Sequence, residues 1–113
     1  MKRVSYQGQG RREHLRLAYP SEFRPILVIG GQKLDVVDIS EKGLCFLNPD
    51  KVGFTGVVKG RLHFLDGDSV VVAGLVAWEN DGLVGLHLTR QGIPYELFFK
   101  EQHNVVFLER LSA

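Results

Sequence analysis

The chain has a single cysteine, Cys45, and no long run of apolar residues. One cysteine cannot form an internal disulfide, which fits a reducing compartment, so we expect a cytoplasmic protein. The longest apolar stretch, residues 70–78, is far shorter than the roughly 18 residues that a membrane span needs. The first ten residues are basic but lack the apolar stretch of a signal peptide. With 113 residues, 44% of them hydrophobic, the composition is that of one globular domain.

The sequence also lacks the residue patterns of enzymes and of metal sites. It contains neither a G-x-S-x-G elbow nor a phosphate-binding P-loop. Cys45 lies in an apolar segment, where a small core residue is more usual than a nucleophile. The histidines are far apart, with no second ligand at the spacing of a zinc site: His14, His63, His87 and His103. We therefore expect no enzyme, no bound metal and no cofactor.

Short β-branched segments joined by tight turns fill the middle of the chain. Gly30-Gly31 and Asp81-Gly82 are two-residue hairpin signals. Gly60, Gly74 and Gly85 lie inside such segments, where glycine allows the bends of a small barrel. The predicted strands are Arg24–Ile29, Gln32–Ile39, Gly43–Asn48, Gly56–Leu65, Ser69–Trp78 and Leu83–Leu88. Six strands with sequential antiparallel connections are typical of an all-β barrel or sandwich.

The pattern changes after Leu88, where a helix is expected. Pro94 suits the first turn of a helix. Apolar residues then recur at helical spacing: Leu97, Phe98, Val105, Leu108 and Leu111. Residues 100–104, KEQHN, are polar throughout, so residues 93–111 form either one helix with an exposed side or two shorter ones. We predict one helix from Tyr95 to Leu111, whose apolar stripe covers an open end of the barrel.

Charge is distributed unevenly along the chain. The net charge is +1, but residues 1–16 carry five basic side chains and one acid, a net +4 that leaves −3 for the rest. Residues 1–11 are rich in Gly and Gln, and we predict that they form a flexible basic arm before a single domain at residues 12–113. A basic arm is typical of a phosphate or nucleic-acid contact, although a solvated tail has the same composition.

Two short motifs frame the first predicted hairpin. Arg12 and Arg16 form an R-x-x-x-R motif, and Asp38, Ser40 and Gly43 form a D-x-S-x-x-G motif. The first is weak alone, whereas the second is more specific. Arginines so close together repel one another and hold no core, so the sequence assigns them no structural role.

Together these motifs resemble the PilZ domain, the bacterial receptor for cyclic di-GMP. The resemblance spans nearly the whole chain, and residues 77–88, AWENDGLVGLHL, are similar to the family's late hairpin. It implies a six-stranded antiparallel β-barrel with an appended C-terminal helix. It also implies cyclic di-GMP as the ligand. Because Arg11 doubles the first arginine of the motif, the resemblance further implies that two intercalated ligand molecules bind each chain.

The chemistry of these side chains suits that ligand. Arginine forks match the O6 and N7 acceptors of guanine and also its phosphates, so Arg12 and Arg16 are candidate ligand contacts. Asp38 can accept from guanine N1–H and N2–H₂, and Ser40 offers a hydroxyl to a phosphate. Gly43 permits a positive φ and close backbone approach. The alternative for the D-x-S-x-x-G motif is an Asx-type turn that only closes a hairpin, and we favour the ligand role because the arginines have no structural role of their own.

Trp78 is the last candidate contact. It ends a predicted strand, where an indole can offer a flat face to a guanine or can cap the core. We expect a cyclic di-GMP receptor whose arm closes over the ligand and changes the surface offered to a separate, unidentified partner protein. Two alternatives stay open: a PilZ-like interaction module that binds no nucleotide, and a small barrel that binds single-stranded nucleic acid. The acidic body and the absence of interleaved Lys and aromatic residues disfavour a nucleic-acid partner.

Overall fold

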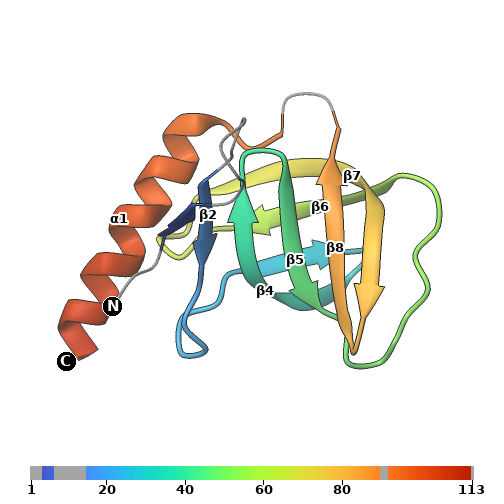
Figure 1. Ribbon diagram of the computed structural model, residues 1–113, viewed down its shortest axis with the longest axis horizontal. Coiled ribbons are helices and arrows are strands. Elements are labelled where there is room, and N and C mark those ends of the chain that lie inside the picture. Colours follow the sequence, from blue (N-terminus) through green and yellow to red (C-terminus); the bar gives the residue numbers. More distant parts are fainter. Residues whose placement is uncertain (1–3, 7–14, 90–91, 113) are drawn as a thin grey trace.

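The computed structural model describes residues 4–6, 15–89 and 92–112. It contains eight strands followed by one helix (Figure 1). The elements are β1 (Val4–Tyr6), β2 (Leu15–Ala18), β3 (Ile26–Ile29), β4 (Gln32–Ser40), β5 (Gly43–Leu47), β6 (Val58–His63), β7 (Ser69–Asn80), β8 (Leu83–Leu88) and α1 (Tyr95–Ser112). The helix is single and continuous, as predicted. In these ranges no helix is long and apolar enough to cross a membrane.

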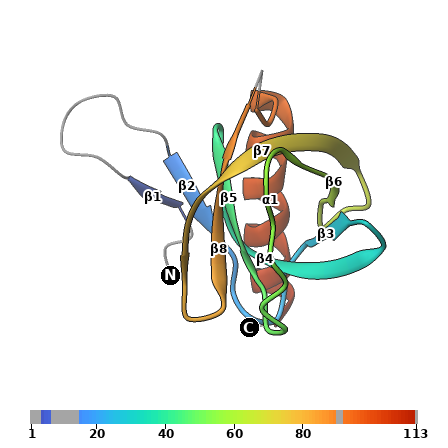
Figure 2. The same ribbon diagram turned by 90° about the vertical axis from the view of Figure 1, so that its right-hand side faces the viewer.

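Six of the strands close into an antiparallel barrel. They pair in the order β4-β3-β6-β7-β8-β5, and β5 pairs again with β4. Figure 2 looks into this ring of strands. The predicted all-β barrel with an appended helix is therefore confirmed, at nearly the predicted strand boundaries. Two further strands, which were not predicted, extend the sheet beyond the ring: β2 pairs with β4, and β1 pairs with β2.

Turn chemistry explains the connections between neighbouring strands. Gly30 and Gly31 have φ values of 54° and 84°, and Asp81 and Gly82 have 50° and 78°. Both residues of such a turn lie in the left-handed region, which matches the twist of a hairpin and favours Gly and Asp. The side chains that alternate inward from these strands form one core, in which Leu27, Phe46 and Leu62 are completely buried.

The helix covers one end of the barrel, as expected from its apolar stripe. Figures 1 and 2 agree on this arrangement, and Phe98 and Val105 are part of the barrel core. Two details of the sequence prediction were wrong. Leu111 does not join the buried stripe, because its side chain is 67% exposed. Glu101 belongs to the segment expected to be exposed, yet it is completely buried.

Hydrogen bonds account for the burial of Glu101. Its carboxylate accepts from the Tyr19 hydroxyl at 2.7 Å and from the Asn104 side-chain amide at 2.8 Å. It also accepts from the backbone N–H of Leu65, at 3.2 and 3.3 Å to its two oxygens. A buried carboxylate is tolerated only with such donors. These contacts join the helix to the segment that follows β2 and to the segment that follows β6.

Candidate functional site

The second arginine of the R-x-x-x-R motif meets the aspartate of the D-x-S-x-x-G motif on the outer face of the barrel. Strand β2 pairs with the end of β4, with Leu17 opposite Ile39 and both side chains completely buried. Because side chains alternate along a strand, the neighbouring Arg16 and Asp38 point outward. An Arg16 guanidinium nitrogen lies 2.8 Å from Asp38 Oδ1, and the two side chains are 37% and 20% exposed. Arg16 therefore has a structural partner, contrary to the expectation from the sequence.

The environment of Asp38 leaves its charge incompletely compensated. Partial burial raises the pKa of this carboxyl above its usual value, and the Arg16 guanidinium offsets only part of that effect. Further N–H donors would stabilise the ionised carboxylate. Such donors are what the Watson–Crick edge of a guanine supplies.

Ser40 and Gly43 close the hairpin between β4 and β5. They are register partners, and the Ser40 hydroxyl makes a long 3.5 Å contact to the Gly43 carbonyl. The positive φ expected at Gly43 is wrong, because Gly43 is not among the glycines with positive φ. Its close backbone approach is present instead, since a Cβ there would lie 3.0 Å from the carbonyl oxygen of Leu86 on β8. These contacts agree with a role in closing the hairpin, and the role of both residues as ligand contacts stays a prediction.

Two β-bulges turn Asp38 and Trp78 to the outside of the barrel. Leu34 and Val36 of β4 point into the core, so strict alternation would also turn Asp38 inward. The register against β5 shifts between Val36 and Asp38, which reverses that direction. In β7 the same shift occurs against β8 between Val76, which packs on the core, and Trp78. Bulges of this kind re-aim single side chains and are frequent beside functional sites.

Both re-aimed residues belong to one row of register partners across four neighbouring strands. Asp38 on β4 pairs with Cys45 on β5, Cys45 with Gly85 on β8, and Gly85 with Trp78 on β7. Adjacent strands lie about 4.8 Å apart, so the two ends of the row are about 14 Å from each other. An acceptor and an aromatic ring thus lie at opposite ends of one outward-facing strip.

The middle of this strip is uncharged, and the Trp78 indole covers part of it. A Cβ at Gly85 would lie 2.3 Å from Cε2 and Nε1 of Trp78, so the indole lies over this glycine. The Trp78 side chain nevertheless remains 46% exposed. Cys45 is buried, and burial is the main cause that raises the pKa of its thiol to about 11, which makes it a poor nucleophile. Gly85 was not predicted as a site residue. The register of β7 against β8, which places this glycine opposite the only tryptophan of the sequence, would have indicated it.

Two of the predicted ligand contacts come before β2 in the sequence. Arg11 and Arg12 lie outside the described residues.

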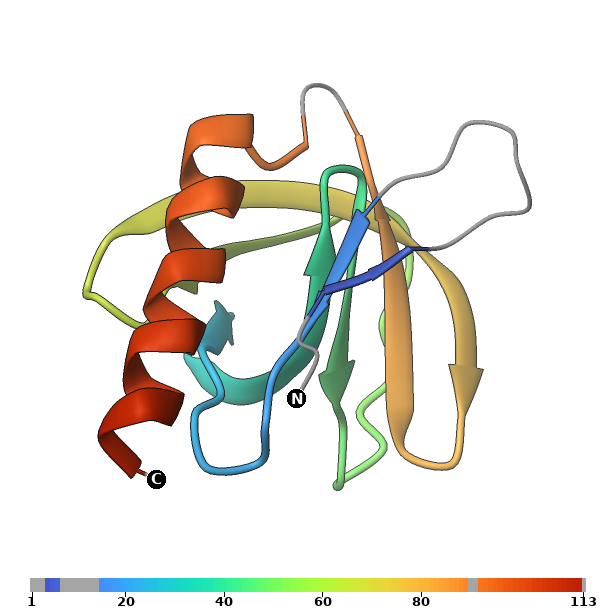
Figure 3. The same ribbon diagram turned by 60° about the vertical axis from the view of Figure 1, so that its left-hand side comes forward.

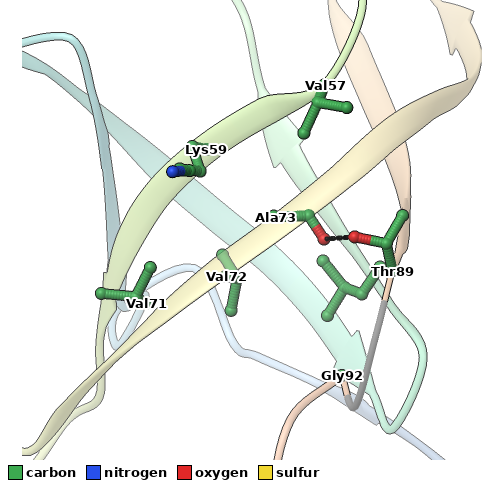
Figure 4. Close-up of a pocket in the computed structure, with 8 residues that line it drawn as sticks. Val57, Lys59, Val71, Val72, Ala73, Thr89 and Gly92 are labelled. Carbon is green, nitrogen blue, oxygen red and sulfur yellow. Dashed lines mark hydrogen bonds between the residues drawn. The ribbon is translucent and has the colours of Figure 1, made fainter.

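A pocket of about 510 Å³ opens beside β6 and β7, lined by Val57, Lys59, Val71, Val72, Ala73, Leu88, Thr89 and Gly92 (Figure 4). None of the predicted site residues lines it. Across residues 4–6, 15–89 and 92–112, no group of three or more His, Cys, Asp or Glu side chains is arranged to hold a metal ion.

Comparison with known protein families matches the PilZ domain model over residues 10–96, most of the chain. This chain belongs to the PilZ domain family. The match includes both motifs and the strands from β2 to β8, and it ends at the beginning of α1. PilZ domains are binding modules, and the family is one of cyclic di-GMP receptors.

Comparison with individual proteins adds the fold alone. No curated protein matches this PilZ chain. A crystal structure of an uncharacterized Legionella protein matches it with a TM-score of 0.51 and 18% sequence identity. The match covers 86% of this chain and 92% of the Legionella chain. At that identity the similarity extends to the architecture and not to the ligand.

Proposed function

We propose that this PilZ domain is a cyclic di-GMP receptor that binds its ligand on the outer strip between the Arg16–Asp38 ion pair and Trp78. The observation that carries the proposal is the pair of bulges, because they turn an acceptor and an aromatic ring to the same face in one register row. The Trp78 side chain is 46% exposed, and this exposure does not stabilise the barrel, whereas it leaves the ring accessible to a ligand. Membership of the PilZ family supports the same ligand.

Each end of the strip has a defined chemical task. Arg16 binds the O6 and N7 edge of a guanine or a phosphate oxygen, since its guanidinium has donors beyond the one at Asp38. Asp38 accepts hydrogen bonds from guanine N1–H and N2–H₂. These donors stabilise the carboxylate charge that Arg16 stabilises only in part. Trp78 stacks on the flat face of a base. A ligand with two guanines can use both ends at once.

Arg11 of the basic arm at residues 1–11 and Arg12, directly after it, complete the site. Ordering an arm costs about 1–2 kcal/mol of backbone entropy per residue. Charge-assisted hydrogen bonds from the arginines to two phosphates offset that cost. Cyclic di-GMP should therefore protect the chain from trypsin cleavage at Arg11 and Arg12.

Binding would reach a partner protein through β2. The backbone N–H of Tyr19, directly after β2, donates to the carbonyl of Val37 beside Asp38, and the Tyr19 hydroxyl donates to Glu101 of α1. A shift of β2 on closure over the ligand would therefore move a contact of the helix. The altered surface would then bind a separate, unidentified partner protein.

Titration calorimetry tests the proposal with two ligands in parallel, cyclic di-GMP and a single-stranded oligonucleotide. We expect saturable binding of cyclic di-GMP and only weak, salt-sensitive binding of the oligonucleotide. Tight oligonucleotide binding without cyclic di-GMP binding would replace the proposal with a nucleic-acid function. Binding of neither would leave a PilZ interaction module without a nucleotide ligand.

A further inference from the structure

The side of α1 that faces away from the barrel is apolar and exposed. Phe98, Glu101 and Val105 make up the buried side. On the opposite side, five large apolar side chains are between 41% and 67% exposed: Tyr95, Phe99, Val106, Phe107 and Leu111. We name these five residues, together with His103 between them, the outer helix face. Figure 3 shows the helix in front of the barrel, with no strand drawn over it.

The rings of this face are ordered against one another. Tyr95 and Phe99 stack with centroids 5.9 Å apart, and Phe99 meets His103 edge to face at 4.8 Å. These contacts align the rings of Tyr95, Phe99 and His103 in one row along the helix. Contiguous exposed apolar surface of this kind marks an interaction site more often than isolated apolar residues do.

We propose that the outer helix face is the contact between two copies of this chain, packed with their α1 helices antiparallel and a two-fold axis beside His103. Four of its five apolar residues, Tyr95, Phe99, Phe107 and Leu111, are spaced symmetrically about His103 in the sequence. An antiparallel copy centred there brings Phe99 of one chain to the level of Phe107 of the other. It likewise brings Tyr95 to the level of Leu111. An isologous contact requires this kind of self-complementarity.

The charges on this side of the helix select the antiparallel direction. Glu96 lies in the first turn of α1 and Arg110 in the last, and both are exposed. They are equally distant from His103, so the antiparallel pair brings Glu96 of each copy to Arg110 of the other, twice per dimer. A parallel pair would instead set like charges side by side, which is unfavourable.

The remaining charge of this surface does not oppose the contact. The ammonium of Lys100 lies 2.6 Å from Asp68 and 3.3 Å from Asp66. Both acids belong to the turn between β6 and β7, so they draw the Lys100 head group toward the barrel. Its methylene stem then faces Val106 of the other copy, as apolar surface.

The size of the helix sets the expected affinity. Eighteen residues form a rod about 27 Å long, and one helix from each copy gives an interface near the lower end of the specific range. We expect a reversible dimer with a dissociation constant between about 1 μM and about 1 mM. This inference concerns the protein without nucleotide and does not depend on the proposed ligand.

Sedimentation velocity of the full chain without nucleotide, up to about 1 mM, tests the contact. The weight-average mass should rise from that of one 12.7 kDa chain toward that of two. Phe107→Glu should keep the circular dichroism of the wild type and remain monomeric. Val71→Glu is the matched control, because Val71 is 55% exposed, close to the 61% of Phe107, but lies on β7. A monomeric wild type, or a dimer that survives Phe107→Glu, would overturn the inference.

Charge reversal tests the antiparallel register. Glu96→Arg and Arg110→Glu should each weaken the dimer about tenfold or more, because each sets like charges together at two places. The double variant should restore wild-type association, since it exchanges the two partners of one contact. Association that the double variant fails to restore would show that the helices do not pair around His103.

Discussion

The hydroxyl of Tyr19 donates a 2.7 Å hydrogen bond to the carboxylate of Glu101, although 82 residues separate them in the sequence. Both side chains are buried, Glu101 completely. This bond ties the end of β2, which carries Arg16, to the middle of α1. The strand at one end of the candidate ligand strip is therefore followed by a residue that is hydrogen-bonded to the helix.

Removal of the Tyr19 hydroxyl should destabilise the fold measurably. Tyr19→Phe leaves the buried Glu101 with one donor fewer, and hydrogen bonds to charged groups contribute about 1.5–3 kcal/mol. Urea denaturation should show a loss of unfolding free energy in that range. Tyr95→Phe removes a hydroxyl from an exposed tyrosine of the same helix and should have little effect. Equal losses of unfolding free energy in the two variants would show that the buried hydrogen bond does not stabilise the fold more than an exposed hydroxyl does.

Glu101 should also give the stability a distinctive pH dependence. Burial is the largest cause that raises the pKa of Glu101 above its usual 4.5, and the hydrogen bonds from Asn104, Tyr19 and Leu65 offset only part of the increase. The folded chain therefore holds this proton more tightly than the unfolded chain does. Stability from this group is present at low pH and is lost as pH rises from about 4.5 through the raised folded pKa.

The comparison with Glu101→Gln isolates that dependence, because the other titrating groups, including Asp38, are common to both proteins. Unfolding free energies measured from about pH 4 to about pH 8 should fall in the wild type relative to the variant. Glu96→Gln, an exposed glutamate on the same helix, serves as the control and should not reproduce this difference. A wild type that gains stability relative to Glu101→Gln as pH rises would contradict the assignment.

Trp78 should report on the ligand and contribute to its binding. A stacked base contributes about 1–3 kcal/mol, so Trp78→Ala should weaken cyclic di-GMP binding roughly fivefold to 150-fold. Its thermal midpoint should hardly change, because the indole is 46% exposed. In the wild type, the ligand should quench the intrinsic fluorescence saturably. A large drop in melting temperature with unaltered affinity would instead make Trp78 a cap on the core.

Gly85→Ala provides an independent test of the same indole. A Cβ there would come within 2.3 Å of the ring, so the indole must move from the surface of β8. The variant should lower ligand affinity in the same direction as Trp78→Ala, although it retains the tryptophan. Wild-type affinity in Gly85→Ala would show that the position of the ring over β8 is not needed.

Local features of the barrel were predictable from the sequence because they depend on local chemistry. Turns with two consecutive positive φ values need residues such as those in Gly30-Gly31 and Asp81-Gly82, so the hairpins could be placed from these dipeptides alone. From the sequence, Arg16 and Asp38 were predicted to belong to the same ligand site but not to contact each other. Their direct contact depends on β2, a strand of four residues that is specified by its pairing with β4 rather than by its own pattern.

Long-range features could not be read from the sequence. The bulges before Asp38 and Trp78 are properties of register between strands, and an alternating pattern read on one strand would turn these side chains the wrong way. Glu101 looked exposed because its neighbours are polar. Its burial depends on Tyr19 and Leu65, which lie 82 and 36 residues away in the sequence.

The number of ligand molecules should depend on Arg11. We predict that two intercalated cyclic di-GMP molecules, with four phosphate charges, bind each chain and that Arg11 pairs with the second. Calorimetry should give a ratio near two for the wild type and near one for Arg11→Ala. A ratio of one in the wild type, or of two in Arg11→Ala, would assign Arg11 no part in binding the second molecule.

The most direct test of the receptor assignment is calorimetric titration of cyclic di-GMP into the wild type, Arg12→Ala, Arg16→Ala and Asp38→Ala. Arg61→Ala, which removes an exposed arginine from β6 away from the strip, is the matched control. The first three variants should each bind at least about tenfold more weakly than the wild type, because each loses a charge-assisted hydrogen bond. Arg61→Ala should bind like the wild type. If Arg16→Ala keeps its fold by circular dichroism and binds cyclic di-GMP with wild-type affinity, the proposed ligand site at Arg16 and Asp38 is contradicted.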